Sequence, residues 1–415
     1  MRVMFAVSDY LPHYFPMVPL GWALQAAGHE VRVVCGTAQQ SHVEGAGLSP
    51  VPVLEDVNML MWARLGLHQA VRAGTAPAEL ELPLVHPETG AELGHPDEFD
   101  VDAFIRSIRG PEAGKAGRRI NAMVDFARDW RPDLVLHDLL HLDGVVPARV
   151  LGVPALCHLT GPIGTEETGW GLDFVPQHYS REFERHGITA TGRALIDRVI
   201  DICPADLAPP TAAERLPLRY VPYNGPGGMD PWMARPAERP RVVVMWSNTL
   251  PHLYGARSFA VPMILDALAG LDVDVVLTMN AAGLAKTGPL PSNVTVVEHC
   301  PLHLLMATAD LLVHSGGAGG LLTATAHGLP QLVVAFGAEY RANGERIEAA
   351  GGGRLLSGPR TDAEELRRSV RALLEDPSHR RGAEKLRDQN LDRPSPADLV
   401  ETLERIAAGP EGAAR

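Results

Sequence analysis

Short apolar runs alternate with stretches of helical periodicity in the first part of the chain. The run MRVMFAVS at residues 1–8 predicts a buried strand, and EVRVVC at residues 30–35 predicts a second strand. Between them, residues 16–27 place apolar side chains at roughly helical spacing before Gly28. A strand, a helix and a strand over about 35 residues form a βαβ unit, which implies a parallel sheet.

The same alternation recurs further along the chain. Residues 120–130 carry a helical apolar stripe that stops before Pro132, and DLVLHD follows as a strand. In the second half, apolar runs with helical patterns between most of them predict the strands RVVVMW, DVDVVLT, NVTVVE, ADLLVH and PQLVVAF. We therefore expect two doubly wound α/β domains. Ligands of such sheets bind beyond the carboxyl ends of the strands, so two facing sheets would enclose a cleft.

Two stretches interrupt this alternation. Residues 224–240 hold four prolines and three glycines, which is typical of a linker, so we expect one domain over residues 1–223 and another over 241–415. Residues 66–114 show poor periodicity and many turn residues, and within them residues 86–102 carry six carboxylates and no Lys or Arg. We expect a mobile excursion near the cleft here, because long loops inside compact domains are usually functional or disordered.

Composition narrows the class of protein. The 415 residues are 46% hydrophobic and 21% charged, which favours a globular protein over a disordered or fibrous one. The net charge of −13 argues against nucleic-acid or membrane-surface partners, because these require a basic footprint. No apolar run is as long as a membrane span and no cationic signal region is present, so we expect a soluble, cytoplasmic protein. The four cysteines are far apart, which argues against a disulfide framework or a thiolate metal site.

The strongest local signal is a glycine-rich turn between the strand ADLLVH and the helical run LLTATAH. A glycine-rich turn that opens a helix presents free backbone N–H groups and the positive end of the helix dipole, so it suits a phosphate group. No Gly-Lys-Ser/Thr sequence follows, which excludes a Walker loop. A tight turn selected only for packing of the strand on the helix is the alternative. The candidate phosphate-binding residues are His314, Gly316, Gly317, Gly319 and Gly320.

A second candidate is a histidine and a carboxylate that follow two strands of the first half. His13 lies after the first strand, at the start of a helical pattern, and Asp138 ends the strand DLVLHD. At one edge of the same sheet they would form a base and the carboxylate that orients it. A structural or exposed histidine is the alternative, and His137 and His141 on either side of Asp138 are competitors for the role.

Signals for a metal ion are weaker. Residues 100–102 and 272–274 match a DxD pattern that can hold a divalent cation, but these aspartates also fit solvated or helix-capping carboxylates. We therefore expect no metal. The segment Ser247, Asn248 and Thr249 follows the strand RVVVMW and can place hydroxyl groups on a phosphate, although such clusters are common in loops.

Taken together, these segments make the chain resemble the glycosyltransferases of the GT-B fold, and in particular the actinomycete enzymes that attach activated deoxysugars to polyketides such as macrolides. The resemblance follows the family's order over nearly the whole chain and is weakest between residues 55 and 115. It implies two facing Rossmann-like domains, with the last helix packing back on the first. The segments that carry it are His13 with PMVPLGWALQAAGHEVRVV, RPDLVLHD, RYVPYNGPG, HCPLHLLMATADLLVHSGGAGGLLTATAHGLPQLV and GAEYRANGERIEAAGGG.

The resemblance also implies a reaction: metal-independent, inverting transfer of a deoxysugar from a dTDP-sugar to a hydroxyl group of an apolar polyketide or macrolide. His13 would be the general base and Asp138 would hold it. The nucleotide sugar is a co-substrate, and no cofactor is implied. The remaining implied residues are His314, Gly316, Gly317, Gly319, Gly320, Ser247 and Thr249 for the diphosphate, His299, Cys300 and Pro301 for the nucleotide base, and Glu339 and Tyr340 for the donor sugar.

Four positions depart from the family's pattern. Ser315, Gly320, Ser247 and Tyr340 stand where the family usually has His, Thr or Ser, Gly and Gln. These departures leave a catalytically silent partner of an active transferase as an alternative, and a nucleotide-sugar epimerase on the same fold is another. The residues themselves do not separate dTDP from UDP, or O- from C-transfer. The segment RYVPYNGPG is similar to that of transferases activated by a cytochrome-like helper protein, so such a partner is an expectation as well.

Overall fold

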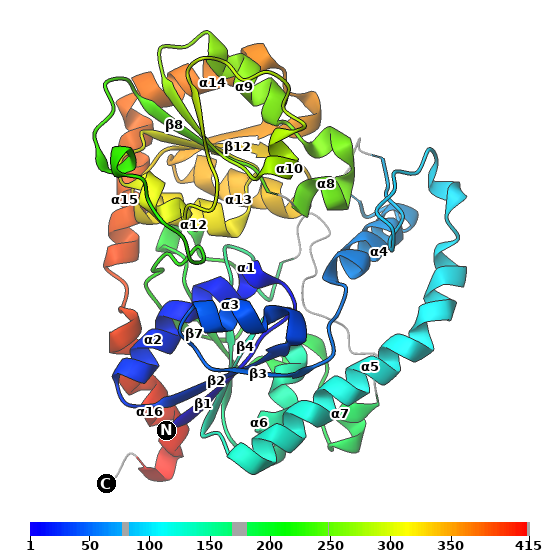
Figure 1. Cartoon of the computed structure of the whole chain (residues 1–415). Coiled ribbons are helices and arrows are strands. Elements are labelled where there is room, and N and C mark those ends of the chain that lie inside the picture. Colours follow the sequence, from blue (N-terminus) through cyan, green and yellow to red (C-terminus); the bar gives the residue numbers. More distant parts are fainter. Residues whose placement is uncertain (77–82, 168–180, 248, 413–415) are drawn as a thin grey trace.

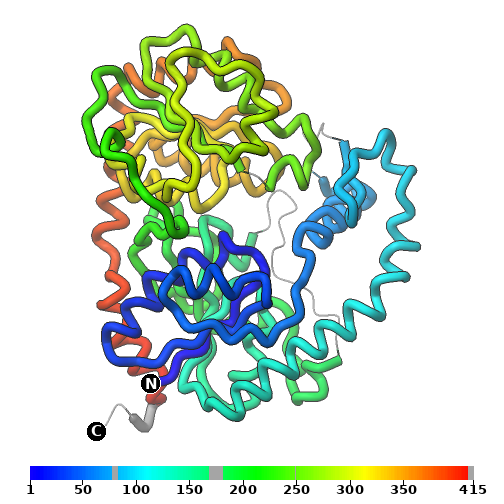
Figure 2. Tube along the Cα trace, in the orientation of Figure 1, coloured from blue at the N-terminus to red at the C-terminus, as the bar shows by residue number. Residues whose placement is uncertain are grey.

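The computed structural model describes residues 1–76, 83–167, 181–247 and 249–412, which form two lobes with a parallel sheet in each (Figures 1 and 2). The two doubly wound α/β domains that the apolar runs predict are therefore confirmed. None of the helices in these ranges combines the length and the apolar composition needed to cross a bilayer.

The first lobe is built on seven parallel strands in the order β3-β2-β1-β4-β5-β6-β7. Successive residues of a strand point to opposite faces, so Val3 and Phe5 pack with α2 (Val18–Ala26), while Met4 and Ala6 pack with α5 (Val101–Trp130) and α6 (Val145–Leu151). Because helices cover both faces, the central strands are largely apolar. The strands are β1 (Arg2–Ala6), β2 (Glu30–Gly36), β3 (Pro50–Leu54), β4 (Leu134–Asp138), β5 (Ala155–His158), β6 (Arg198–Asp201) and β7 (Glu214–Pro217).

The second lobe repeats this plan with six parallel strands in the order β10-β9-β8-β11-β12-β13. Helices α9 (Val261–Ala269) and α14 (Ala363–Glu375) cover one face, and α11 (Leu302–Met306) and α12 (Ala318–Ala326) cover part of the other. The strands are β8 (Arg241–Met245), β9 (Asp274–Thr278), β10 (Val294–Val297), β11 (Leu311–His314), β12 (Gln331–Ala335) and β13 (Gly353–Ser357). The other helices are α1 (Leu11–Tyr14), α3 (Gln40–Gly45), α4 (Met59–Arg72), α7 (Glu182–Arg185), α8 (Thr249–Tyr254), α10 (Ala281–Leu284), α13 (Ala338–Ala349), α15 (Pro377–Leu391) and α16 (Pro396–Gly412).

The segment over residues 66–114 corrects the prediction of a mobile excursion. Helix α4 runs to Arg72 and α5 begins at Val101, so both ends of the segment are helical, while residues 77–82 lie outside the described part. The long helix was missed because Pro111 and the glycines near it interrupt its periodicity and have poor helix propensity. In Figure 1 the two helices form an arm on one side of the lobes.

The DxD pattern at residues 100–102 belongs to this arm. The Asp100 carboxylate accepts a hydrogen bond from the Ala103 N–H at 2.9 Å and caps α5. Asp102 forms an ion pair with Arg72 at 2.9 Å, which links α5 to α4. These carboxylates therefore have structural partners.

After α15 the chain crosses back to the first lobe, where α16 packs against α2 (Figures 1 and 2). Leu399, Val400 and Leu403 join the same apolar core as Leu20 and Leu24. The last helix of the chain is thus part of the core that covers the first sheet.

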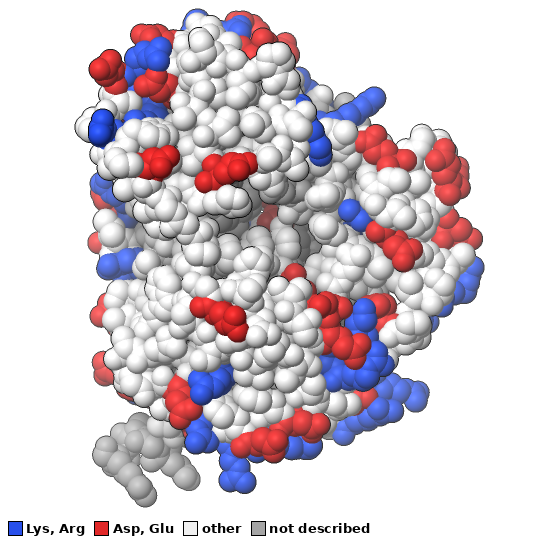
Figure 3. Space-filling model, in the orientation of Figure 1, with Lys and Arg blue, Asp and Glu red and all other residues white. Residues whose placement is uncertain are grey.

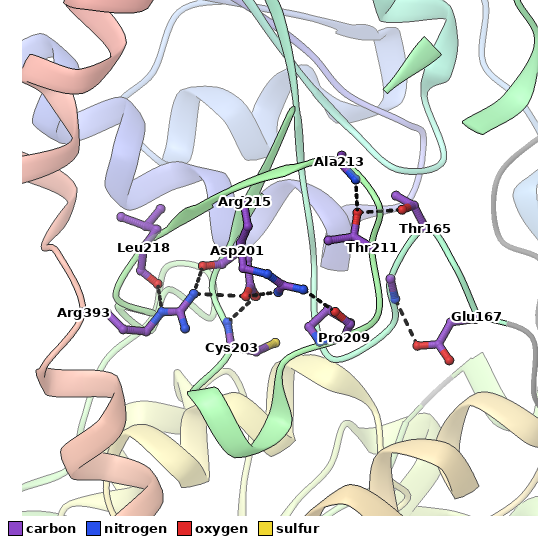
Figure 4. A network of polar contacts seen from close by, with 11 residues as sticks. Thr165, Glu167, Asp201, Cys203, Pro209, Thr211, Ala213, Arg215, Leu218 and Arg393 are labelled. Carbon is purple, nitrogen blue, oxygen red and sulfur yellow. Dashed lines mark hydrogen bonds and ion pairs between the residues drawn. The ribbon is translucent and has the colours of Figure 1, made fainter. Parts of the chain in front are cut away.

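A buried ionic network fixes the crossing (Figure 4). The guanidinium of Arg393 lies 3.1 Å from Asp201 Oδ2, and its Nε donates to the Leu218 carbonyl at 3.1 Å. Asp201, which is fully buried, also pairs with Arg215 and accepts the Cys203 N–H at 2.9 Å. A buried carboxylate is stable only with such partners, so the segment after α15 is held firmly to β6.

Candidate active site

Four loops meet between the lobes, and each follows a strand where the strand order of its sheet reverses. In the first sheet these strands are β1 and β4, and in the second they are β8 and β11. Such reversals open a crevice at the carboxyl ends of the strands. A cavity of about 780 Å³ lies here, lined mostly by the first lobe and by Thr249, Leu253, Glu339 and Tyr340 of the second. Figure 3 shows this face hollowed between the lobes.

The structure brings His13 and Asp138 together on the first-lobe side of this cavity. His13 lies on the short helix α1 directly after β1, and Asp138 is the last residue of β4. The His13 Nδ1 atom is 3.5 Å from Asp138 Oδ1. The histidine side chain is 17% exposed and the carboxylate 0%, so the imidazole reaches the cavity from a buried anchor. Catalytic hydrogen bonds are often long in a free enzyme and shorten when substrate binds.

Asp138 is held in place by the backbone of both neighbouring loops. Its Oδ2 accepts the Ser8 N–H at 2.6 Å, and its Oδ1 accepts the Leu140 N–H at 2.8 Å. Burial alone would raise the pKa of this carboxyl, but the neighbouring His13 and these hydrogen bonds hold the pKa of Asp138 below its ordinary value. Asp138 is therefore a fixed negative charge facing the histidine.

The two histidines that flank Asp138 occupy other positions. The His137 Nδ1 lies 3.0 Å from the Asp138 carbonyl oxygen, and the His141 Nε2 lies 3.4 Å from Met123 Sδ. Burial lowers the pKa of both, that of His141 to about 4. Neither histidine stands beside the Asp138 carboxylate as His13 does, although His141 lines the cavity.

In the second lobe, the glycine-rich turn joins β11 to α12 as predicted, although its residues are not among those that line the 780 Å³ cavity. His314 is fully buried, and its Nδ1 accepts the Gly316 N–H at 3.2 Å. Burial lowers the pKa of His314 to about 4, so this imidazole is neutral at pH 7. Gly316 has a φ of 97°, and a Cβ there would lie 2.6 Å from the Tyr340 carbonyl oxygen. The turn therefore requires glycine at this position, and the N-terminus of α12 opens just beyond it.

The unusual glycine at position 320 has a structural reason. A Cβ on Gly320 would collide with Met245 Cε, because the Met245 side chain fills the space beside α12. Gly319, one residue earlier, has nothing within 4 Å of the corresponding position. A hydroxyl residue at position 320 therefore fits only if the flexible end of the Met245 side chain moves away.

This packing gives a testable prediction. Gly320→Thr is expected to lower the free energy of unfolding by about 1–3 kcal/mol, because the added atoms overpack the Met245 site. Chemical denaturation measures the change. Gly319→Ala is the matched control and should be neutral or slightly stabilising, since the site is open and helical. Met245→Ala should rescue Gly320→Thr in the double variant, and a loss that persists there would contradict the explanation.

The residues predicted to border the nucleotide base lie next to the linker. His299, Cys300 and Pro301 connect β10 to α11, and the His299 carbonyl lies against Gly227. Cys300 Sγ is 3.7 Å from Met233 Sδ, and burial raises the pKa of the Cys300 thiol. These residues are not among those that line the 780 Å³ cavity.

Glu339 and Tyr340, the residues predicted for the donor sugar, occupy the first turn of α13 and line the cavity. Burial raises the pKa of both groups. The Tyr340 side chain also lies 3.8 Å from the Cβ position of Gly317, so it packs against the glycine-rich turn.

The segment of Ser247 and Thr249, which follows β8 in the second lobe, also reaches the cavity through Thr249. The Thr249 N–H donates to Ser247 Oγ at 3.1 Å, while Asn248 lies outside the described residues. The Tyr10 hydroxyl lies 3.2 Å from Thr249 Oγ1 and connects the two lobes.

Two parts of the cavity wall were missed in the sequence. Tyr10 follows β1 directly, and its ring centroid is 5.2 Å from that of His13; its place after a strand was an available signal. The arm also contributes, for example Trp62 from α4 and Ile105 from α5.

No group of three or more His, Cys, Asp or Glu side chains in the described ranges is arranged to hold a metal ion. In the second DxD pattern, at residues 272–274, both carboxylates pair with Arg239.

Comparison with known proteins gives two family-model matches, described as "Erythromycin biosynthesis protein CIII-like". The N-terminal domain model matches residues 22–246, and the C-terminal domain model matches residues 262–406. The chain is 32% identical to the 3-alpha-mycarosylerythronolide B desosaminyl transferase of Saccharopolyspora erythraea, covering 99% of each protein. It is 34% identical to the L-demethylnoviosyl transferase of Streptomyces niveus, covering 97% of each.

Solved structures agree over the same length. The chain matches the spinosyn forosaminyltransferase SpnP with a TM-score of 0.75 and 26% identity, covering 98% of this chain and 99% of that one. It also matches the structure of the spinosyn rhamnosyltransferase SpnG complexed with thymidine diphosphate. The TM-score is 0.73 and the identity 27%, and the match covers 98% of this chain and 100% of that one.

Proposed function

We propose, from the premise that the chain belongs to the erythromycin biosynthesis protein CIII-like family of polyketide glycosyltransferases, that it transfers a deoxysugar from a dTDP-sugar to a hydroxyl group of an apolar polyketide. Family membership makes the chain a glycosyltransferase, and its two parallel-sheet lobes match the GT-B structures. One observation supports the proposal most. The strand-order reversals carry a His13–Asp138 pair in the first lobe and a glycine-rich helix N-terminus in the second, and Tyr340, which lines the cavity with His13, packs against that glycine-rich turn.

The proposed reaction begins at His13. Its Nδ1 lies 3.5 Å from Asp138 Oδ1, so the neutral imidazole would carry its proton on Nδ1 and use Nε2 to take the proton of the acceptor hydroxyl. The acceptor oxygen then forms a bond to the anomeric carbon of the sugar as the bond to the dTDP oxygen breaks. Attack from the face opposite the leaving group gives inversion. Asp138 stabilises the imidazolium that forms.

The leaving diphosphate takes up the electron pair and would be met by the second lobe. The N–H groups at the start of α12 and the positive end of its dipole favour negative charge there. His314 holds the turn through Gly316, and the hydroxyls of Ser247 and Thr249 lie on the same side of the cleft. His299, Cys300 and Pro301 remain the proposed base-binding segment. No step of this reaction requires a metal ion.

The acceptor is proposed to occupy the part of the cavity under the arm. A volume of about 780 Å³ lies in the range of pockets that enclose one small molecule. Apolar side chains of α4 and α5 supply much of this wall, which suits a reduced polyketide ring better than a sugar. They include Met59, Leu60, Trp62, Leu65, Ile105 and Ile108.

Thermal denaturation with a panel of dTDP, UDP, GDP and NAD, with and without magnesium, tests the donor. A ligand that binds only the folded state stabilises it by about 2.7 kcal/mol at a hundredfold excess over Kd. We expect dTDP to raise the melting temperature, with no effect of magnesium. Stabilisation by NAD and by no nucleoside diphosphate would contradict the proposal.

The silent-partner alternative is tested by turnover with a dTDP-deoxysugar. The glycine at position 320 is the observation in its favour, since a hydroxyl donor is missing beside the turn. Binding of dTDP without transfer to any acceptor would support it. The expectation of a cytochrome-like activating protein stays a prediction, and full activity of the purified chain alone would contradict it.

A further inference from the structure

Within the part of the chain that the structure describes, Glu339 is a carboxylate without a cationic partner, at the second-lobe end of the cavity. It lies in the first turn of α13, is half-buried and lines the cavity. Among the described residues, no hydrogen bond or ion pair reaches its carboxylate. Burial raises the pKa of Glu339, and His13 is the group that opposes this rise. An unpaired carboxylate that is partly removed from water is costly, so the site favours a ligand that supplies the missing charge.

Two other carboxylates that line the same cavity do have cationic partners. Glu112 pairs with Lys115 at 3.0 Å, and Asp9 pairs with Arg119 at 3.0 Å. Both cations come from α5, on the first-lobe side. The third cation that lines the cavity, Arg109, also lies on α5, so the positive side chains of this wall are on the first-lobe side and none among the described residues pairs with Glu339.

Tyrosines gather near this carboxylate. Tyr10 and Tyr340 line the cavity with Glu339, and the Tyr254 hydroxyl lies against Gly337, two residues before it. Burial raises the pKa of all three phenols, and the negative charge of Glu339 adds to each rise, so the three side chains lie within its field. Aromatic faces beside a carboxylate attract ammonium groups, whereas a hydroxyl group cannot neutralise the charge.

We propose that Glu339, with Tyr10 and Tyr340, recognises an ammonium group on the donor sugar, so that the donor is a dTDP-aminodeoxysugar. This proposal rests on the proposed function, because it concerns the donor of that same reaction. Tyr340 supports it, since it places an aromatic ring where an amide would offer two N–H donors and an acceptor oxygen to sugar hydroxyls.

Calorimetric binding of matched nucleotides at pH 7 tests the proposal without requiring an acceptor. The probes are dTDP, dTDP-6-deoxyglucose, and its two analogues in which an amino group replaces the hydroxyl at carbon 3 or at carbon 4. We expect at least one amino analogue to bind about tenfold or more tightly than the hydroxyl parent, as a charge-assisted contact predicts. Glu339→Gln should remove this preference and leave dTDP binding unchanged.

Two further variants complete the test. Glu339→Asp keeps the charge and should retain part of the preference. Glu345→Gln neutralises a carboxylate on the same helix that pairs with Arg341, and should retain the whole preference. Equal binding of the amino and hydroxyl nucleotides, or a preference that survives in Glu339→Gln, would overturn the proposal while dTDP binding upheld the transferase. Failure of dTDP itself to bind would remove both.

Discussion

His13→Ala is expected to lower kcat for glycosyl transfer by about 10²–10⁴-fold, the range that a positioned general base contributes. The physical reason is that no other histidine stands beside the Asp138 carboxylate in the described cavity wall. Affinity for dTDP should stay nearly unchanged, because the proposed diphosphate-binding residues lie on the second lobe. Steady-state transfer to a hydroxyl acceptor and calorimetric binding of dTDP measure the two effects separately.

The chain offers a matched control on its surface. His95 Nδ1 lies 3.2 Å from Asp97 Oδ2, and both side chains are exposed. His95→Ala therefore removes an imidazole beside a carboxylate far less buried than Asp138, and it should leave kcat within about twofold, since exposed pairs contribute little. Activity of His13→Ala close to that of His95→Ala would contradict the assignment of His13 as the base.

Asp138→Asn is expected to lower both activity and stability. The asparagine amide can hold His13 in the wrong tautomer, so kcat should fall by about 10²–10⁴-fold, as in other His–Asp pairs. Asparagine also has one acceptor oxygen where the carboxylate accepts from Ser8 and Leu140, so one buried N–H loses its partner. That loss should reduce the free energy of unfolding by about 1–3 kcal/mol.

The pH dependence of the free energy of unfolding distinguishes the contribution of the Asp138 charge from that of the packing around it. The folded-state pKa of Asp138 lies below its unfolded value, so its contribution is present above about pH 4 and is lost as pH falls through the folded pKa. Asp138→Asn should therefore lose stability at neutral pH and approach the wild type in acid. Asp97→Asn, at the exposed pair, should change neither quantity. A loss for Asp138→Asn that is the same at pH 3 and pH 7 would show that packing, and not charge, is responsible.

The apolar runs predicted the sheets well because both faces of each sheet are covered, so the strands need no polar side. They did not predict β3, β5, β6, β7 or β13. Prolines interrupt β3, and β5, β6 and β7 are only four residues long, with charged side chains such as Arg198 in β6 and Glu214 in β7. Strands β3, β7 and β13 lie at the edges of their sheets, where less burial is required.

The candidate site was predictable where a residue ends a strand, as Asp138 and His314 do, or lies in the loop or helix that comes next, as His13 does. What could not be read from the chain depends on contacts between distant segments. The packing of Met245 against Gly320, the lack of a cation beside Glu339, and the helical arm over the cavity are such contacts. Each is set by tertiary packing, which local periodicity does not report.

The return of Arg393 and α16 to the first lobe limits how this enzyme can be recombined with its relatives. Donor-side residues lie in the second lobe, so exchanging that lobe at the linker would be the simple way to change the sugar. Yet the exchange would also replace Arg393 and α16, which belong to the packing of the first lobe. A foreign C-terminus without an arginine at the position of Arg393 would leave Asp201 short of one cation inside the recipient. A working hybrid should therefore return to the recipient's own sequence near residue 390, so that the donor module is an insertion and not a terminal half.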